Sequence, residues 1–263
     1  MATSLARSGV CDFVLVDDDI LKPGNLIRHD LDCNDLGGHK ADALGARLRA
    51  VSPGVKVNVR RVILGGQESS ATTASVLDEL ATCHILIDAT ADPQAFNLLA
   101  SVARTAARPM IWAEVFAGGI GGFVARLRPN TEPTPHRARQ QYLAWCEQEG
   151  VPWRATDGGM YDARGDAGPM IADDADVSII AAHATRMAID YLIQPDHSGF
   201  PHPAYFIGLK KAWIFTEPLD VRPLDFLAEG PWQPAQDPAA ATEAVNYMLS
   251  LIEPRDDERL TGA

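Results

Sequence analysis

The sequence predicts an α/β fold: a Rossmann-like, doubly wound, mostly parallel sheet with a crossover segment and a C-terminal extension. Short apolar runs alternate with segments of helical periodicity through residues 1–130. Such alternation is typical of parallel strands joined by right-handed crossover helices. In addition, several apolar runs end in carboxylates. Because open α/β sheets bind ligands at the carboxyl ends of their strands, these acidic residues are the first functional candidates.

The elements of the first half follow in order. Short apolar or alternating runs predict the strands, at residues 13–16, 56–62, 84–87 and 110–115. Apolar positions at helical spacing predict helices at 40–51, 73–81 and from Pro93 onward, where proline suits the first helical turn.

In the second half, strands and helices no longer alternate regularly. Residues 118–128 read as a turn and a strand, 137–149 and 176–193 as helices, and 205–209 and 212–215 as two late strands that pair with each other. We expect a nucleotide-binding domain over residues 1–217, with a crossover segment at about 129–175. A Pro-rich arm and a C-terminal helix at 242–252 then occupy residues 218–263.

Composition limits the class of protein. With 263 residues and 46% hydrophobic content, the chain can bury a core of its own. A net charge of −12 with scattered basic residues argues against nucleic acid as a partner. No apolar run is long enough to cross a membrane and the N-terminus has no signal-peptide pattern, so we expect no membrane contact and a cytoplasmic location.

The stretch LVDDDILKPGNLIRHDL, followed by Lys40, holds the densest set of candidates. Asp17 ends a predicted strand, where a carboxylate accepts hydrogen bonds from ribose hydroxyls. Arg28 presents a planar fork to phosphate oxygens and Lys40 a point charge, and Asn25 adds a neutral donor. The alternative is that Asp18 and Asp19 are solvated, Asn25 caps the next turn, and Arg28 and Lys40 face solvent.

A second carboxylate cluster follows the strand at 84–87. Asp88 and Asp92 stand at the carboxyl end of this strand, where one of them can hold Mg²⁺ against phosphates, and Asp92 is the preferred ligand. Asp92 also precedes Pro93, so it suits the N-cap of the next helix, and the two roles are compatible.

Together these motifs resemble the ThiF, MoeB and HesA superfamily of ubiquitin-activating-type adenylyltransferases. The resemblance rests on D-x-D-x(5)-N-L-x-R with a downstream lysine, a strand ending in D-A-T, and the segment GGIGGFVARLRP. It implies ATP and Mg²⁺ as cofactors, with Asp17, Asp19, Asn25, Arg28, Lys40 and Asp88 binding the nucleotide and Asp92 the metal. Arg28, Lys40 and Asp92 would be the catalytic residues.

The resemblance also implies partners: a ubiquitin-like or sulfur-carrier protein as substrate, a conjugating enzyme, and a second copy of the chain in a homodimer. The sequence departs from the family pattern in three places. The chain starts inside the helix that follows the family's first strand and G-x-G-x-x-G loop, so we expect weakened ATP binding. It has no paired C-x-x-C ligands, so no zinc is expected, and no cysteine in residues 131–139.

Cys146 is the one cysteine near the crossover segment. A lowered pKa would let its thiolate carry the modifier as a thioester, but the neighbouring Glu147 and Glu149 favour an ordinary helix cysteine.

Two alternatives to an adenylating enzyme stay open. One is a catalytically impaired scaffold subunit of an activating complex, favoured by the expected loss of the glycine loop. The other is an NAD-dependent oxidoreductase, since a carboxylate after the second strand also suits NAD ribose.

Overall fold

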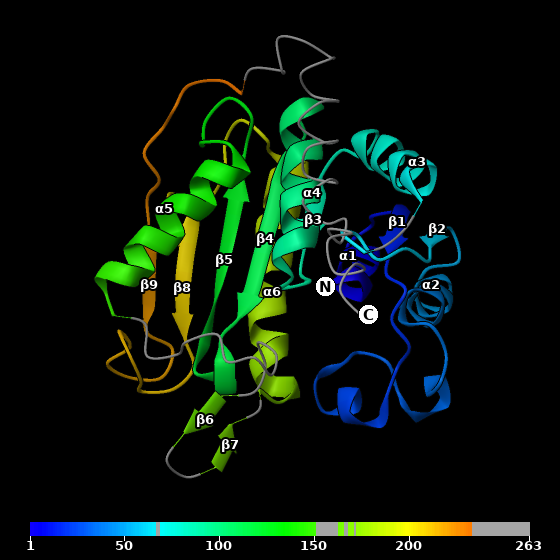
Figure 1. Cartoon of the computed structure of the whole chain (residues 1–263), viewed down its shortest axis with the longest axis horizontal. Coiled ribbons are helices and arrows are strands. Elements are labelled where there is room, and N and C mark those ends of the chain that lie inside the picture. The colour runs from blue at the N-terminus through cyan, green and yellow to red at the C-terminus, as the bar shows by residue number, and fades with distance from the viewer. Residues whose placement is uncertain (67–68, 151–162, 166–167, 171, 233–263) are drawn as a thin grey trace, which may run out of the picture. The chain divides into compact units, whose positions relative to one another are not determined.

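The chain folds into the α/β arrangement that the alternating pattern predicts (Figure 1). The computed structural model describes residues 1–66, 69–150, 163–165, 168–170 and 172–232. These residues belong to one compact unit, Met1–Trp232. The predicted helix at 242–252 lies outside the described residues.

The N-terminal elements form a small parallel pair of strands. The helix α1 (Ala2–Arg7) precedes β1 (Asp12–Val16), and the helix α2 (Lys40–Val51) precedes β2 (Lys56–Arg60). β1 and β2 pair in parallel, with Asp12 opposite Lys56. Leu48 and Val55 pack here with the apolar side chains of both strands, including Leu15 and Val57. The predicted strand and helix boundaries are confirmed to within a few residues.

The loop between β1 and α2 folds back on itself. It contains two short 3₁₀ turns, η1 (Pro23–Arg28) and η2 (Cys33–Asp35). The buried Leu21 anchors it: its amide donates to the carbonyl of Gly38 at 2.9 Å and its carbonyl accepts from the amide of Gly37 at 3.0 Å. An isolated bridge joins Ile20 to His39. The closed loop therefore brings the start of α2 next to the end of β1.

A second sheet has five strands in the order β3–β4–β5–β8–β9. β3 (Leu86–Asp88) and β4 (Met110–Val115) are parallel, whereas β5 (Gly121–Leu127), β8 (Ala204–Gly208) and β9 (Val221–Leu224) continue the sheet antiparallel. The sheet is therefore mixed. The helices are α3 (Ser70–Ala81), α4 (Pro93–Thr105), α5 (Pro135–Gln148) and α6 (Asp174–Ile193). A short hairpin of β6 (Ala163–Gly165) and β7 (Gly168–Met170) precedes α6.

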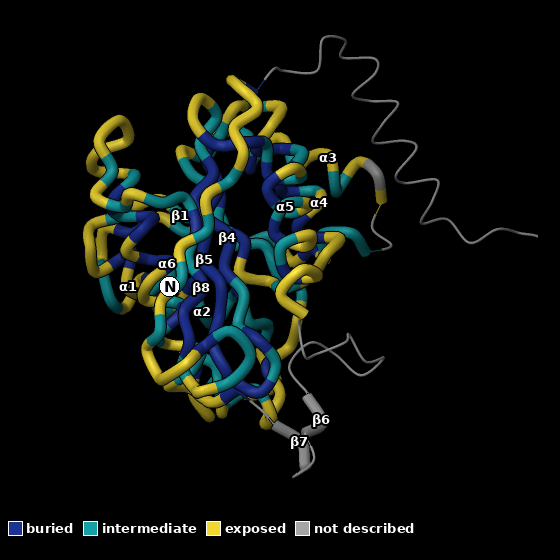
Figure 2. Tube along the Cα trace, turned by 90° about the vertical axis from the view of Figure 1, so that its left-hand side faces the viewer, coloured by how far each residue is buried: buried dark blue, intermediate teal, exposed yellow. Residues whose placement is uncertain are grey.

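Helices cover both faces of the five-stranded sheet. α4 and α5 pack on one face around Phe96, Trp112 and Phe206, and α6 packs on the other against β4 and β5 through Ile180 and Met187. Figure 2 shows β4, β5 and β8 as the buried centre of this arrangement. Burial of this apolar area is the main source of the fold's stability.

The late-strand prediction is wrong in one part. Residues 204–208 form β8, but residues 212–215 form a turn, in which the amide of Phe215 donates to the carbonyl of Ala212 at 3.0 Å. The Phe215 ring packs so closely on Gly208 that a Cβ there would lie 2.4 Å from it. β8 pairs instead with β9, from the segment predicted to be an extended arm. Pro223 is accepted there because β9 is an edge strand.

The boundary at residues 217 and 218 stays a prediction. Within the described residues, no helix has the length and apolar character that crossing a membrane requires.

Candidate nucleotide-binding site

The carboxyl end of β1 carries a charged pair. The Lys40 ammonium donates to Asp19 Oδ2 at 2.7 Å, and the Lys40 amide donates to the Asp19 carbonyl at 2.8 Å. The lysine side chain is only 17% exposed, whereas that of Asp19 is 67% exposed. The fold-back of the preceding loop therefore brings together two residues that are 21 positions apart.

Asp17 lies beside this pair and is half-buried. Its Oδ1 accepts from the Asp19 amide at 2.7 Å, which closes a tight turn after the strand. Burial raises the pKa of Asp17, and the Asp19 amide and the nearby Lys40 charge oppose that rise. A half-buried carboxylate with one oxygen fixed is a suitable acceptor for sugar hydroxyls.

The turn η1 supplies the next candidates. Asn25 Oδ1 accepts from the Lys22 amide at 2.9 Å. Asn25 therefore caps this turn, which was the predicted alternative to a role in phosphate binding. Arg28 is the last residue of η1 and is half-buried. His29 follows it; burial lowers its pKa, Lys40 lowers it further, and Asp17 raises it. His29 thus lies within electrostatic reach of both residues, although nothing in its sequence neighbourhood indicated that.

The carboxyl end of β3 holds Asp88 and Asp92. Asp88 is 1% exposed; its Oδ1 accepts from the amide and hydroxyl of Thr90 at 2.9 and 2.7 Å. Its Oδ2 has no hydrogen-bond partner among the described residues. Asp92 Oδ1 accepts from the amides of Gln94 and Ala95 at 2.7 and 2.8 Å. Asp92 therefore caps α4, which leaves its second oxygen for another role.

Glu114 and Arg139 lie near Asp88 and were not candidates in the sequence. Glu114 on β4 accepts from Trp112 Nε1 at 3.0 Å and from the Tyr142 hydroxyl at 3.1 Å. Burial raises the pKa of Glu114 and that of Asp88, and the charge of Arg139 opposes both shifts. Arg139 lies 4.6 Å from the ring centre of Phe96. A glutamate inside the otherwise apolar strand WAEV was the available signal.

These residues fit a magnesium nucleotide. Lys40 supplies a positive charge at the strand edge and Asp17 a sugar acceptor. In the described part of the chain, no group of three or more acidic, histidine or cysteine side chains surrounds a metal position. Nucleotide-bound Mg²⁺ needs only one or two carboxylates, because phosphates and water complete its shell. The exposed Asp92 and the neighbouring Asp88, whose buried Oδ2 has no hydrogen-bond partner among the described residues, are the carboxylates that would hold the ion.

Cys146 lies in the core, 7% exposed, on the α5 side of the sheet. Its pKa is raised to about 12, mainly by burial; Tyr142 opposes this rise and Glu114 adds to it. A thiol in these surroundings stays protonated near neutral pH and is a poor nucleophile. The geometry argues against a thioester on this residue.

Alkylation tests the state of this thiol. At pH 8, iodoacetamide should label the exposed Cys11 and Cys33 at least about tenfold faster than the buried, protonated Cys146. Peptide mapping by mass spectrometry against time gives the rates in one sample, so the exposed cysteines are internal controls. Labelling of Cys146 as fast as that of Cys11 in folded protein would restore the thioester role.

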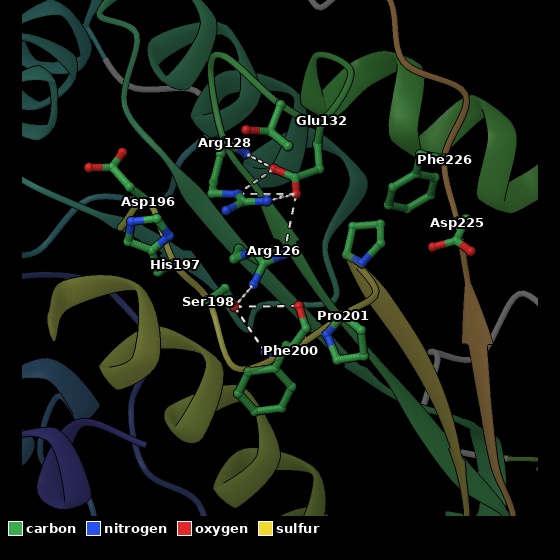
Figure 3. A pocket seen from close by; sticks show the side chains of 12 residues that line it. Arg126, Arg128, Glu132, Asp196, His197, Ser198, Phe200, Pro201, Asp225 and Phe226 are labelled. Carbon is green, nitrogen blue, oxygen red and sulfur yellow. Dashed lines mark hydrogen bonds and ion pairs between the residues drawn. The ribbon is translucent and has the colours of Figure 1, made fainter. Parts of the chain in front are cut away.

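A separate cavity of about 420 Å³ lies at the C-terminal end of β5 (Figure 3). Arg126 and Arg128 enter it from β5 and the residue after it, and both contact Glu132. Arg126 pairs with Ile111, near the start of β4. The cavity therefore lies at the other end of β4 from its carboxyl end, where the proposed site residues are. Glu132 pairs with both arginines, and Arg126 also contacts Ser198 and Asp190. We assign it a structural role.

Comparison with known proteins identifies one family. The family model described as "ThiF family" matches residues 1–216. The ATP-dependent ubiquitin transferase-like protein Cap2 of Escherichia coli (strain TW11681) is 33% identical over 100 residues, which cover 37% of this chain and 16% of Cap2. The uncharacterized protein y4qC of Sinorhizobium fredii (strain NBRC 101917 / NGR234) is 25% identical over 206 residues, covering 74% of this chain and 35% of y4qC.

Solved structures share the fold. PaaA has a TM-score of 0.61 at 17% identity, covering 86% of this chain and 68% of PaaA. E. coli MccB with ATP has a TM-score of 0.61 at 13% identity, covering 86% of this chain and 60% of MccB. The chain spans about a third or less of the curated relatives that it matches. These likenesses confirm the Rossmann-like α/β fold.

Proposed function

The chain belongs to the ThiF family, and from that premise we propose that it is an ATP-dependent adenylyltransferase acting on a carboxylate of a peptide or protein. The observation that carries the proposal is the ordered group at the end of β1. There, Lys40 is held by Asp19, and Asp17 is fixed beside them. A dinucleotide oxidoreductase needs a ribose carboxylate at this position, but it has no need of the lysine.

In the proposed reaction, a carboxylate oxygen of the substrate attacks the α-phosphorus of ATP. The bond from the α-phosphorus to the bridging oxygen breaks, pyrophosphate leaves with the bonding electrons, and an acyl adenylate remains. Negative charge grows on the leaving group, and Lys40 and Arg28 stabilise it. Asp17 orients the ribose, and Asn25 and Asp19 keep η1 and Lys40 in place. Mg²⁺, held by Asp92 with Asp88 nearby, would neutralise phosphate charge when bound.

Relatives suggest the finer substrate class. Cap2 is named as ubiquitin transferase-like, and MccB has been solved with MccA. We propose a ubiquitin-like or sulfur-carrier protein whose C-terminal carboxylate is activated. A conjugating enzyme and a homodimer belong to the same proposal.

The test combines nucleotide binding with exchange. Calorimetry with MgATP and with NADH distinguishes an adenylating enzyme from an oxidoreductase. ATP–pyrophosphate exchange is then measured with a panel of short peptides that differ in their last residue, each with a free carboxylate and, as the control, with an amidated C-terminus. We expect MgATP binding and exchange only with free carboxylates. Tight NADH binding favours the oxidoreductase, and MgATP binding without exchange favours a scaffold subunit.

Asp92 allows its two roles to be separated. Asn is as good an N-cap as Asp, so Asp92→Asn should change the free energy of unfolding by less than about 0.5 kcal/mol, whereas Asp92→Ala should lower it by about 1 kcal/mol. Both variants should weaken MgATP binding at least about tenfold if Asp92 is the metal ligand. The measurements are urea unfolding and calorimetry. Unchanged MgATP affinity in Asp92→Asn would leave Asp92 with the capping role alone.

A further inference from the structure

We propose that Lys210 binds the substrate carboxylate and aligns it with the nucleotide, an inference that rests on the proposed adenylation. Lys210 follows β8, on the loop that leads to β9. It was no candidate in the sequence, because nothing in the run YFIGLKKAW distinguishes it from the adjacent Lys211.

The backbone of Lys210 is fixed at the carboxyl end of β4. The amides of Leu209 and Lys210 both donate to the carbonyl of Ile120, at 2.9 and 3.1 Å. Ile120 directly follows η3 (Ala117–Gly119), the short turn between β4 and β5. Lys210 is therefore anchored to the strand edge at which ligands of this fold class bind.

The side chain is held in one direction. Its ammonium donates to the carbonyl of Gly118 at 2.9 Å and to Asp176 Oδ2 at 3.4 Å. An ammonium group has three donor hydrogens, so these two contacts leave one for a ligand. The Lys210 side chain is 48% exposed while that of Asp176 is 13% exposed, so an incoming group meets the lysine first.

The surroundings place this cation near the proposed nucleotide site. Asp176 belongs to the first turn of α6, and α6 packs against η1, which carries Asn25 and Arg28. η3 packs against the strand β7 that precedes α6. The helix that carries the partner of Lys210 therefore also contacts the element that carries Arg28.

Local chemistry favours a carboxylate over a phosphate chain at Lys210. The positive charge of Lys210 is partly neutralised by Asp176, and Asp173 and Asp174 lie near Asp176 at the start of α6. These carboxylates oppose the several negative charges of a triphosphate more strongly than the single charge of a carboxylate. The backbone at η3 also lacks bulk: Gly119 has φ +63°, and a Cβ there would lie 1.9 Å from Asp176 Oδ2. The glycine thus allows the Asp176 carboxylate to approach the backbone of η3, next to the carbonyl of Gly118 that accepts from Lys210.

The test uses the peptide that supports the fastest exchange in the wild-type protein. Lys210→Ala should raise the KM for that peptide at least about tenfold and leave the KM for ATP within about twofold. Lys211→Ala removes the same charge from the next position and is the matched control, expected to behave as wild type. Thermal unfolding of each variant reports whether the loop is still anchored.

Asp176→Asn distinguishes carboxylate binding from a merely structural latch. A latch predicts that Lys210→Ala and Asp176→Asn impair the protein alike, since each breaks the same ion pair. Carboxylate binding predicts that Asp176→Asn leaves the peptide KM unchanged or lowers it, because the lysine charge is then less neutralised. A peptide KM unchanged in Lys210→Ala, or raised equally in both variants, overturns the inference and leaves the proposed function intact. No exchange by the wild-type protein overturns both.

Discussion

Replacing Lys40 by alanine is expected to lower the rate of ATP–pyrophosphate exchange by about 100-fold or more. The fold holds the Lys40 ammonium at the end of β1, 2.7 Å from Asp19, with the lysine side chain only 17% exposed. A preorganised charge in such a position stabilises the leaving pyrophosphate without reorganising in the transition state. Exchange kinetics with saturating MgATP and peptide measure the effect on turnover.

The fold should survive this change. The Lys40–Asp19 pair involves a well-exposed carboxylate, and pairs of this kind contribute at most about 1 kcal/mol to stability. Lys56→Ala, an exposed lysine at the start of β2, is the matched control and should exchange at the wild-type rate. Lys40→Arg keeps the charge but changes its geometry, so partial activity is expected. An alanine variant that is folded and exchanges normally would remove Lys40 from the proposed mechanism.

Replacing Glu132 by alanine is expected to lower the free energy of unfolding by about 3–5 kcal/mol. Glu132 is 5% exposed and accepts from Arg126 at 3.3 Å and from Arg128 at 2.7 Å. Arg126 is itself 2% exposed, so the variant leaves a buried guanidinium without its main counter-charge. Urea unfolding followed by circular dichroism measures the loss.

Two further variants test the cause of this loss. Glu147→Ala removes an exposed glutamate of α5 and should change stability by less than about 0.5 kcal/mol. The double variant Arg126→Met with Glu132→Ala removes the stranded charge as well, so it should recover part of the stability lost by Glu132→Ala alone. If the double variant is less stable by the sum of the two single effects, the pair is not coupled and the explanation is wrong.

Local patterns were sufficient for most of the first half of the fold. The helix at 40–51 and the strand at 110–115 match the structure residue for residue, because apolar spacing acts within a few positions. For the same reason Asp92 and Pro93 mark the start of α4. The same local reasoning made Asp17 and Lys40 candidates, because their residue types and positions near a strand end and a helix start can be read from the sequence. Their contacts were not readable: the 2.7 Å pair of Lys40 with Asp19 exists because Leu21, Gly37 and Gly38 close the loop between them.

Contacts between distant segments decided the rest. Residues 212–215 carry a strand-like composition, yet Phe215 packs on Gly208 and leaves the edge of β8 to β9. The environment of Cys146 follows from burial by α5 on the sheet, which no neighbouring residue encodes. The Asp88, Glu114 and Arg139 group draws on β3, β4 and α5, so the sequence indicated Asp88 beside Asp92 but not its proximity to Glu114 and Arg139.

Family and fold class could therefore be predicted from the sequence alone. The alternation of strands and helices, the carboxylates at strand ends and the turn motifs all depend on short stretches of chain. The ion pairing of Lys40, the buried state of Cys146 and the orientation of Lys210 required the folded chain. Each depends on contacts between residues that are far apart in the sequence, 21 positions for Lys40 and Asp19 and 92 for Lys210 and Gly118. Only tertiary packing brings such residues together.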